Sequence, residues 1–97
     1  MQQSIRLKLD EMVKRYQTLE NMQSDSEVMV DHKMYEKVAK EMHSLADIVN
    51  AYGRYQSLEA SKEEAEMMLN DPEMGDLAQQ ELEEATQALS EVNQELM

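Results

Sequence analysis

The side chains best suited to chemistry in this sequence are two histidines, His32 and His43, and several groups of acidic residues. His32 and Glu36 are four residues apart, so a helix would present both on one face as potential metal ligands. A structural zinc site needs four ligands, and the chain has no cysteine and no third histidine. We therefore expect no metal site, and we interpret both histidines as surface residues of a helix.

Other polar residues lack the surroundings that catalysis requires. Asp71, Glu73 and Asp76 cluster without the spacing of a calcium loop, and acidic residues are favoured at the start of a helix. The two glycines, Gly53 and Gly75, stand apart and form no phosphate-binding loop. A serine nucleophile needs an oriented base, and glutamates on polar helix faces need a cleft to shift their pKa. We therefore expect a protein that is not an enzyme, with no catalytic residue and no cofactor.

The elements that position these residues are predicted to be helices. The 97 residues include two glycines, one proline, four tyrosines and no phenylalanine or tryptophan. The chain is rich in Glu, Gln, Leu, Met and Ala, which lose little side-chain freedom in a helix. A sandwich or barrel would need β-branched strands and frequent glycine turns. No apolar run reaches the roughly 20 residues that span a bilayer, and no signal peptide is apparent. The composition therefore predicts an all-α fold of thin helices.

Apolar residues at spacings of three and four predict a first helix over about 4–22, with Ser4 as its N-cap. Ser24 and Glu27 have capping-box spacing, which predicts one short helical turn after that helix. The apolar residues at 28–30 that follow are expected to close the end of a bundle.

A long second helix is predicted over about 32–69, with Asp31 as its N-cap. We expect it to continue through Gly53, and a break near 51–54 is the alternative. Asp71 and Pro72 predict the start of a third helix over about 72–97. The apolar stripes of the three helices comprise Ile5, Leu9, Met12, Tyr16 and Leu19; Tyr35, Val38, Met42, Leu45, Val49 and Tyr52; and Met74, Ala78, Leu82, Ala85, Leu89, Val92 and Leu96.

The lengths of the predicted helices constrain how they pack. At 1.5 Å per residue they span about 28, 57 and 39 Å, so the middle helix can take one antiparallel partner on each half. The outer two must overlap partway along it, where Leu45 would be buried by all three helices. The prediction is a single domain over 1–97, an elongated antiparallel three-helix, coiled-coil-like bundle with a long middle helix.

The net charge of −12 is unevenly distributed along the chain. Residues 1–22 carry a net +1, residues 23–70 a net −5, and residues 71–97 eight acidic and no basic groups. Nucleic-acid binding depends on Lys and Arg that neutralise phosphates, so we expect no direct sequence-specific nucleic-acid binding, and no membrane association. A basic protein partner is one interpretation of this acidity, and a solvated face that keeps the bundle soluble is the plainer one.

Ten methionines give the chain an unusual supply of adaptable apolar side chains. Met12, Met42, Met68 and Met74 fall in or beside the apolar stripes and are expected to fill the core. Met29 and Met34 are the better candidates for exposed contacts.

One segment of the sequence has a specific resemblance. Residues 65–74, Ala-Glu-Met-Met-Leu-Asn-Asp-Pro-Glu-Met, and residues 77–82, Leu-Ala-Gln-Gln-Glu-Leu, closely resemble the N-terminal domain of bacterial peptide chain release factor 1. This is the class I type that reads UAA and UAG, and the resemblance extends over essentially all 97 residues. Gly75 stands where we expect a long charged residue in this family.

The resemblance implies a role in translation termination in the cytoplasm. In the family, the codon-reading tripeptide and the Gly-Gly-Gln catalytic loop lie downstream of this domain, and neither occurs in these residues. It therefore implies a helical domain excised from a longer chain that contacts the ribosome through the full-length factor. The implied partners are a protein of the large-subunit stalk base and the release-factor GTPase, and the implied role is docking and positioning. A generic acidic coiled-coil adaptor and a catalytic fragment are the competing hypotheses.

Overall fold

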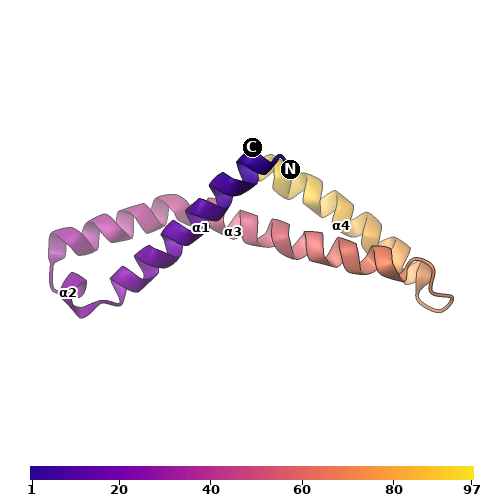
Figure 1. Cartoon of the computed structure of the whole chain (residues 1–97), viewed down its shortest axis with the longest axis horizontal. Helices are drawn as coiled ribbons and strands as arrows, with labels where there is room; N and C mark the ends of the chain where they lie inside the picture. The colour runs from indigo at the N-terminus through magenta and orange to yellow at the C-terminus, as the bar shows by residue number, and fades with distance from the viewer. The chain divides into compact units, whose positions relative to one another are not determined.

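The computed structural model describes all 97 residues, and every regular element in it is a helix (Figure 1). The helices are α1 (Gln3–Gln23), α2 (Ser26–Met29), α3 (His32–Met68) and α4 (Gly75–Leu96). The predicted all-α class, with a long middle helix, is confirmed. The chain forms two compact units, Met1–Asn50 and Ala51–Met97, and α3 contributes one half to each. No helix is long and apolar enough to cross a membrane.

The start of α1 differs from the prediction. Ser4 lies inside the helix, and the N-cap is Gln2, whose side chain makes no capping hydrogen bond. Gln3 is a good helix former, so the helix begins one residue earlier than predicted. The N-cap position requires only an extended backbone, which Gln2 adopts with φ −65° and ψ 145°. Ser4 was therefore wrongly predicted as the N-cap.

The short turn predicted after α1 is present as α2, but Asp25 caps it. One carboxylate oxygen of Asp25 accepts a hydrogen bond from the Glu27 N–H at 2.8 Å. Ser24 ends α1 instead, where its hydroxyl donates to the Glu20 carbonyl oxygen at 3.3 Å. The capping-box interpretation of Ser24 and Glu27 was wrong because the neighbouring aspartate is an equally good cap.

Helix α3 begins and continues as predicted. The Asp31 carboxylate accepts from the Met34 N–H at 3.1 Å, and the Asp31 carbonyl accepts from the Tyr35 N–H at 2.9 Å. The helix passes through Gly53 without interruption. Favourable helix formers on both sides outweigh the roughly 1 kcal/mol that a glycine costs in a helix interior.

The link between α3 and α4 depends on Asp71. Its carboxylate accepts from the N–H groups of Glu73 at 2.8 Å and Met74 at 3.2 Å, as expected of a capping residue. These bonds cap a turn over residues 72–74, so α4 begins at Gly75. The predicted start at position 72 was three residues too early. A Cβ at Gly75 would lie 2.9 Å from the Leu69 carbonyl oxygen, closer than such atoms approach. The tight return therefore explains why glycine occupies this position.

In the unit Met1–Asn50, α1 and the first half of α3 run antiparallel and bury a small apolar core. Leu19 is fully buried, and Leu9 and Val38 are nearly so. Leu45 is only half-buried, so its predicted place at the centre of the core was wrong. On the rim, the Arg15 guanidinium binds the Glu41 carboxylate through two hydrogen bonds of 2.6 and 2.8 Å.

Residues 28–30, at the end of α2, do not close the end of a bundle as predicted. Val30 is 81% exposed and Met29 is 58% exposed, because the short α2 leaves this turn without an element to cover it. Met29 and Met34 are exposed, as their assignment to surface contacts requires. Met68 and Met74, expected to fill the core, are both 38% exposed where α3 ends and α4 is about to begin.

In the unit Ala51–Met97, the second half of α3 and all of α4 run antiparallel around a core of mostly small residues. Small side chains let two helix backbones approach closely. Four of the buried residues, Tyr52, Ala78, Ala85 and Val92, belong to the predicted stripes. The buried residues are Ala51, Tyr52, Tyr55, Ala65, Ala78, Ala85 and Val92.

Candidate docking groove

The residues first considered for chemistry stay apart in the structure. His32 and His43 are both exposed on α3, and no three side chains of the types that bind metals converge anywhere in the chain. Of the acidic cluster, Asp71 is engaged in backbone hydrogen bonds, while Glu73 and Asp76 are exposed. These positions are explained by helix and turn formation.

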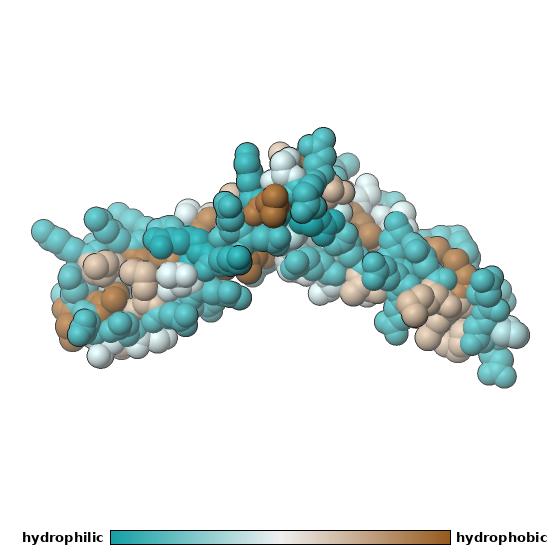
Figure 2. Space-filling view, in the orientation of Figure 1, coloured by the Kyte–Doolittle hydropathy of each residue, from teal (hydrophilic) through white to brown (hydrophobic).

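The distribution of charge between the two units is far more distinctive. The unit Met1–Asn50 contains nine acidic and seven basic residues, a net charge of −2. The unit Ala51–Met97 contains twelve acidic and two basic residues, a net charge of −10. Hydrophilic side chains cover much of the visible surface of both units (Figure 2). The second unit therefore carries most of the net negative charge of the molecule, −10 of −12.

Acidic residues of α4 form a stripe along one side of the helix. Glu81, Glu84, Glu91 and Glu95 follow one another at spacings of three, seven and four, with Ala88 in the gap. Residues at such spacings share one helix face, so the four carboxylates form a continuous edge. The side-chain amides of Gln80 and Gln87 donate hydrogen bonds of 3.3 Å to Glu84 and Glu91, and these neutral donors leave the carboxylate charges intact. The four glutamates of this edge are hereafter called the acidic stripe.

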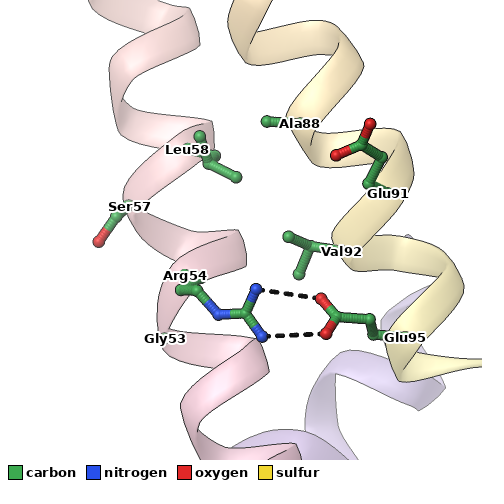
Figure 3. Close-up of a pocket in the computed structure, with 8 residues that line it drawn as sticks. All are labelled: Gly53, Arg54, Ser57, Leu58, Ala88, Glu91, Val92 and Glu95. Carbon is green, nitrogen blue, oxygen red and sulfur yellow. Dashed lines mark hydrogen bonds and ion pairs between the residues drawn. The ribbon is translucent and has the colours of Figure 1, made fainter.

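A groove runs between α3 and α4 beside the acidic stripe. Its larger hollow has a volume of about 560 Å³, and a second of about 420 Å³ shares Leu58 and Ala88 with it. In Figure 3 the side chains of Leu58, Ala88 and Val92 point into the space between the helices, while Ser57 points away from α4. The groove exists because Gly53 and Ala88 supply little side-chain volume; nothing lies within 4 Å of a Cβ built on Gly53.

One ion pair crosses the groove at its end. The Arg54 guanidinium binds the Glu95 carboxylate with nitrogen–oxygen distances of 3.1 and 3.2 Å (Figure 3). Both side chains are about half exposed, at 56% and 52%. Exposed pairs of this kind contribute little to stability, roughly 0–1 kcal/mol, so Glu95 can exchange its partner at low cost.

A comparison with known families identifies the family of the chain. The sequence profile of the PCRF domain matches residues 12–97, most of the chain. The chain belongs to the PCRF domain family. It is therefore a member of the peptide chain release factor family, which acts in translation termination and so interacts with the ribosome. No solved structure matches the chain. The predicted resemblance to release factors is confirmed at the level of the family.

The groove of this PCRF domain was missed by the sequence interpretation. Its floor combines α3 residues near 53–58 with α4 residues near 88–92, which are distant in the sequence. The one available signal was the acidic stripe, whose helical spacing is visible in the sequence alone.

Proposed function

We propose that this PCRF domain docks and positions a release factor of the UAA- and UAG-reading type on the ribosome, and performs no chemistry itself. Its contacts would lie at the stalk base of the large subunit, with a basic ribosomal protein there and with the release-factor GTPase. The setting is the cytoplasm, where the intact factor would read the codon and trigger hydrolysis through segments outside these residues.

The observation that carries this proposal is the net charge of −10 on the unit Ala51–Met97. A surface of this charge repels the phosphates of rRNA and attracts basic protein surfaces. Complementary charge mainly raises the rate of association and fixes orientation, which suits a module that guides a factor into a binding site.

The test compares the intact factor with one that lacks residues 1–97. We expect the truncated factor to bind stalled ribosomes more slowly, with the difference shrinking as ionic strength rises, because salt screens exposed charges over about 8 Å at physiological strength. Single-turnover peptide release at saturating factor should change little. If the truncated factor binds normally but its saturated release rate collapses, the domain assists the chemistry and the docking proposal fails.

A second measurement separates docking from activity in the chain itself. Added alone to ribosomes stalled at UAA, residues 1–97 should release no more peptide than buffer does. Release above that background would refute the proposal that the domain performs no chemistry.

A further inference from the structure

The groove between α3 and α4 has the dimensions of a helix-binding surface. Its lining extends from Gly53 to Glu64 on α3 and from Glu81 to Glu95 on α4. At 1.5 Å per residue these segments are about 16 and 21 Å long, which corresponds to three or four helical turns. A third helix laid along the groove would convert the helix pair into a three-helix layer, the arrangement that buries an apolar stripe from each member.

The chemistry of the groove selects the character of that helix. The floor is apolar, formed by Leu58, Ala85, Ala88 and Val92. Its α4 edge is the acidic stripe, and Glu64 lies on the α3 side of the smaller hollow. The only basic residue of the lining, Arg54, is already paired with Glu95. A partner must therefore present apolar residues to the floor and positive charges to the edge.

The same features argue against other occupants. Phosphate groups of RNA and the anionic headgroups of a membrane would be repelled by the carboxylates of the rim. Small-molecule sites enclose most of the ligand's surface, whereas this groove is long and open to solvent. A second copy of the chain carries a net charge of −12, so electrostatic repulsion opposes its approach to the stripe.

We propose that this groove binds a basic amphipathic helix of a partner protein, with apolar residues at helical spacing on the floor and Lys or Arg against the acidic stripe. This inference rests on the proposed docking function and names the class of partner. Arg54 acts as a placeholder: an incoming arginine can take its place on Glu95 with the same two-point geometry.

The experiment uses the 97-residue chain and a synthetic peptide as the probe. The peptide is a capped helix of about 14 residues, with leucines at spacings of three and four and lysines and arginines beside them. Titrated into isotope-labelled protein, it should shift the backbone amide resonances of Leu58, Ala88 and Val92 and leave those of residues 1–30 unchanged. A peptide of the same composition in scrambled order should give much weaker shifts.

Two double variants separate groove binding from general attraction. Glu84→Lys with Glu91→Lys reverses two charges of the rim, while Glu63→Lys with Glu83→Lys makes the same charge change at exposed positions outside the lining. We expect the rim variant to weaken peptide binding at least about tenfold relative to the control, from two exposed charge pairs lost and reversed. Glu83 and Glu84 are well matched, since each accepts a hydrogen bond from a glutamine four residues earlier.

A third variant tests the floor of the groove without a change of charge. Ala88→Leu fills the hollow with a side chain that favours the helix, so binding should fall while helical content is kept. Equal weakening by the two double variants would overturn the inference, as would the absence of binding. Groove resonances that shift with protein concentration in the absence of peptide would instead assign the groove to self-association.

The outcome is independent of the ribosome experiment. Peptide binding in the groove combined with an unaffected truncated factor would refute the docking function while leaving the helix-binding groove intact. Slow ribosome binding by the truncated factor, with no peptide binding, would support the docking function and refute the helix-binding groove.

Discussion

The two glycines of this chain should respond in opposite directions to the same substitution. Gly53 lies within the long helix α3, and a Cβ built there meets no other atom within 4 Å. Gly75 is the first residue of α4, and a Cβ there would lie 2.9 Å from the Leu69 carbonyl oxygen. Alanine therefore meets open space at the first position and backbone at the second.

The magnitudes follow from these surroundings. Gly53→Ala should stabilise the fold by about 0.8–1 kcal/mol, the difference in helix propensity between the two residues. Gly75→Ala gains part of the same propensity, but the α3–α4 return must open to relieve the contact with Leu69. Overpacking of this kind costs typically 1–3 kcal/mol, so the net effect should be destabilising by about 1 kcal/mol.

Urea denaturation followed by helical circular dichroism measures both effects, and thermal melts give a second reading. A change of 1 kcal/mol corresponds to about 4–8 °C in a domain of this size. The melting temperature should rise for Gly53→Ala and fall for Gly75→Ala, with unchanged helical content in both. Two shifts in the same direction would refute the close approach of residue 75 to the end of α3.

Three further predictions concern the core, a cap and an ion pair. Leu19→Ala should destabilise by about 2–5 kcal/mol because Leu19 is fully buried, whereas Leu7→Ala, at a 53% exposed position, should cost less than about 0.5 kcal/mol in the same melts. Asp71→Ala removes both capping bonds of the α3–α4 turn and should cost about 0.5–2 kcal/mol; an unchanged urea midpoint would contradict the capping role. Hydrogen bonding from Arg15 lowers the pKa of Glu41 below its ordinary value of 4.5, so the stability from this pair is present at neutral pH and lost as pH falls through the folded-state pKa. The stability gap between the wild type and Glu41→Gln should therefore close in acid, and a gap that persists there would assign the effect to packing.

Helix periodicity accounts for how much of this fold was predictable. The bounds of α1 and α3 lie within about one residue of the predicted 4–22 and 32–69, because apolar residues at spacings of three and four extend through both. The errors occur at helix ends, where several polar residues compete for the same backbone groups. Asp25 rather than Ser24 caps α2, and Gly75 rather than Pro72 begins α4.

Burial was less predictable than helix position, because a stripe has a fixed width and the partner helix does not cover all of it. Leu45 belongs to the stripe of α3 yet remains half-buried, while Tyr52 on the same stripe is 1% exposed. The groove between α3 and α4 was harder still to predict from the sequence. It depends on the absence of side-chain volume at Gly53 and Ala88, which face one space only after α4 has folded back along α3.

The placement of the acidic residues favours the proposed recognition of a helix over simple solubility as their role. Like charges three or four residues apart on a helix cost about 0.2–0.5 kcal/mol per pair, and Glu81–Glu84 and Glu91–Glu95 are both such pairs. An even distribution around α4 would keep the domain equally soluble with less repulsion. Instead, four of the six acidic residues of α4 follow the edge of the groove, and only Glu95 has a basic partner. A basic helix in the groove would neutralise this repulsion and bury the apolar floor in the same step. The repulsion energy of the free domain would therefore be released on binding and would add to the affinity for the partner.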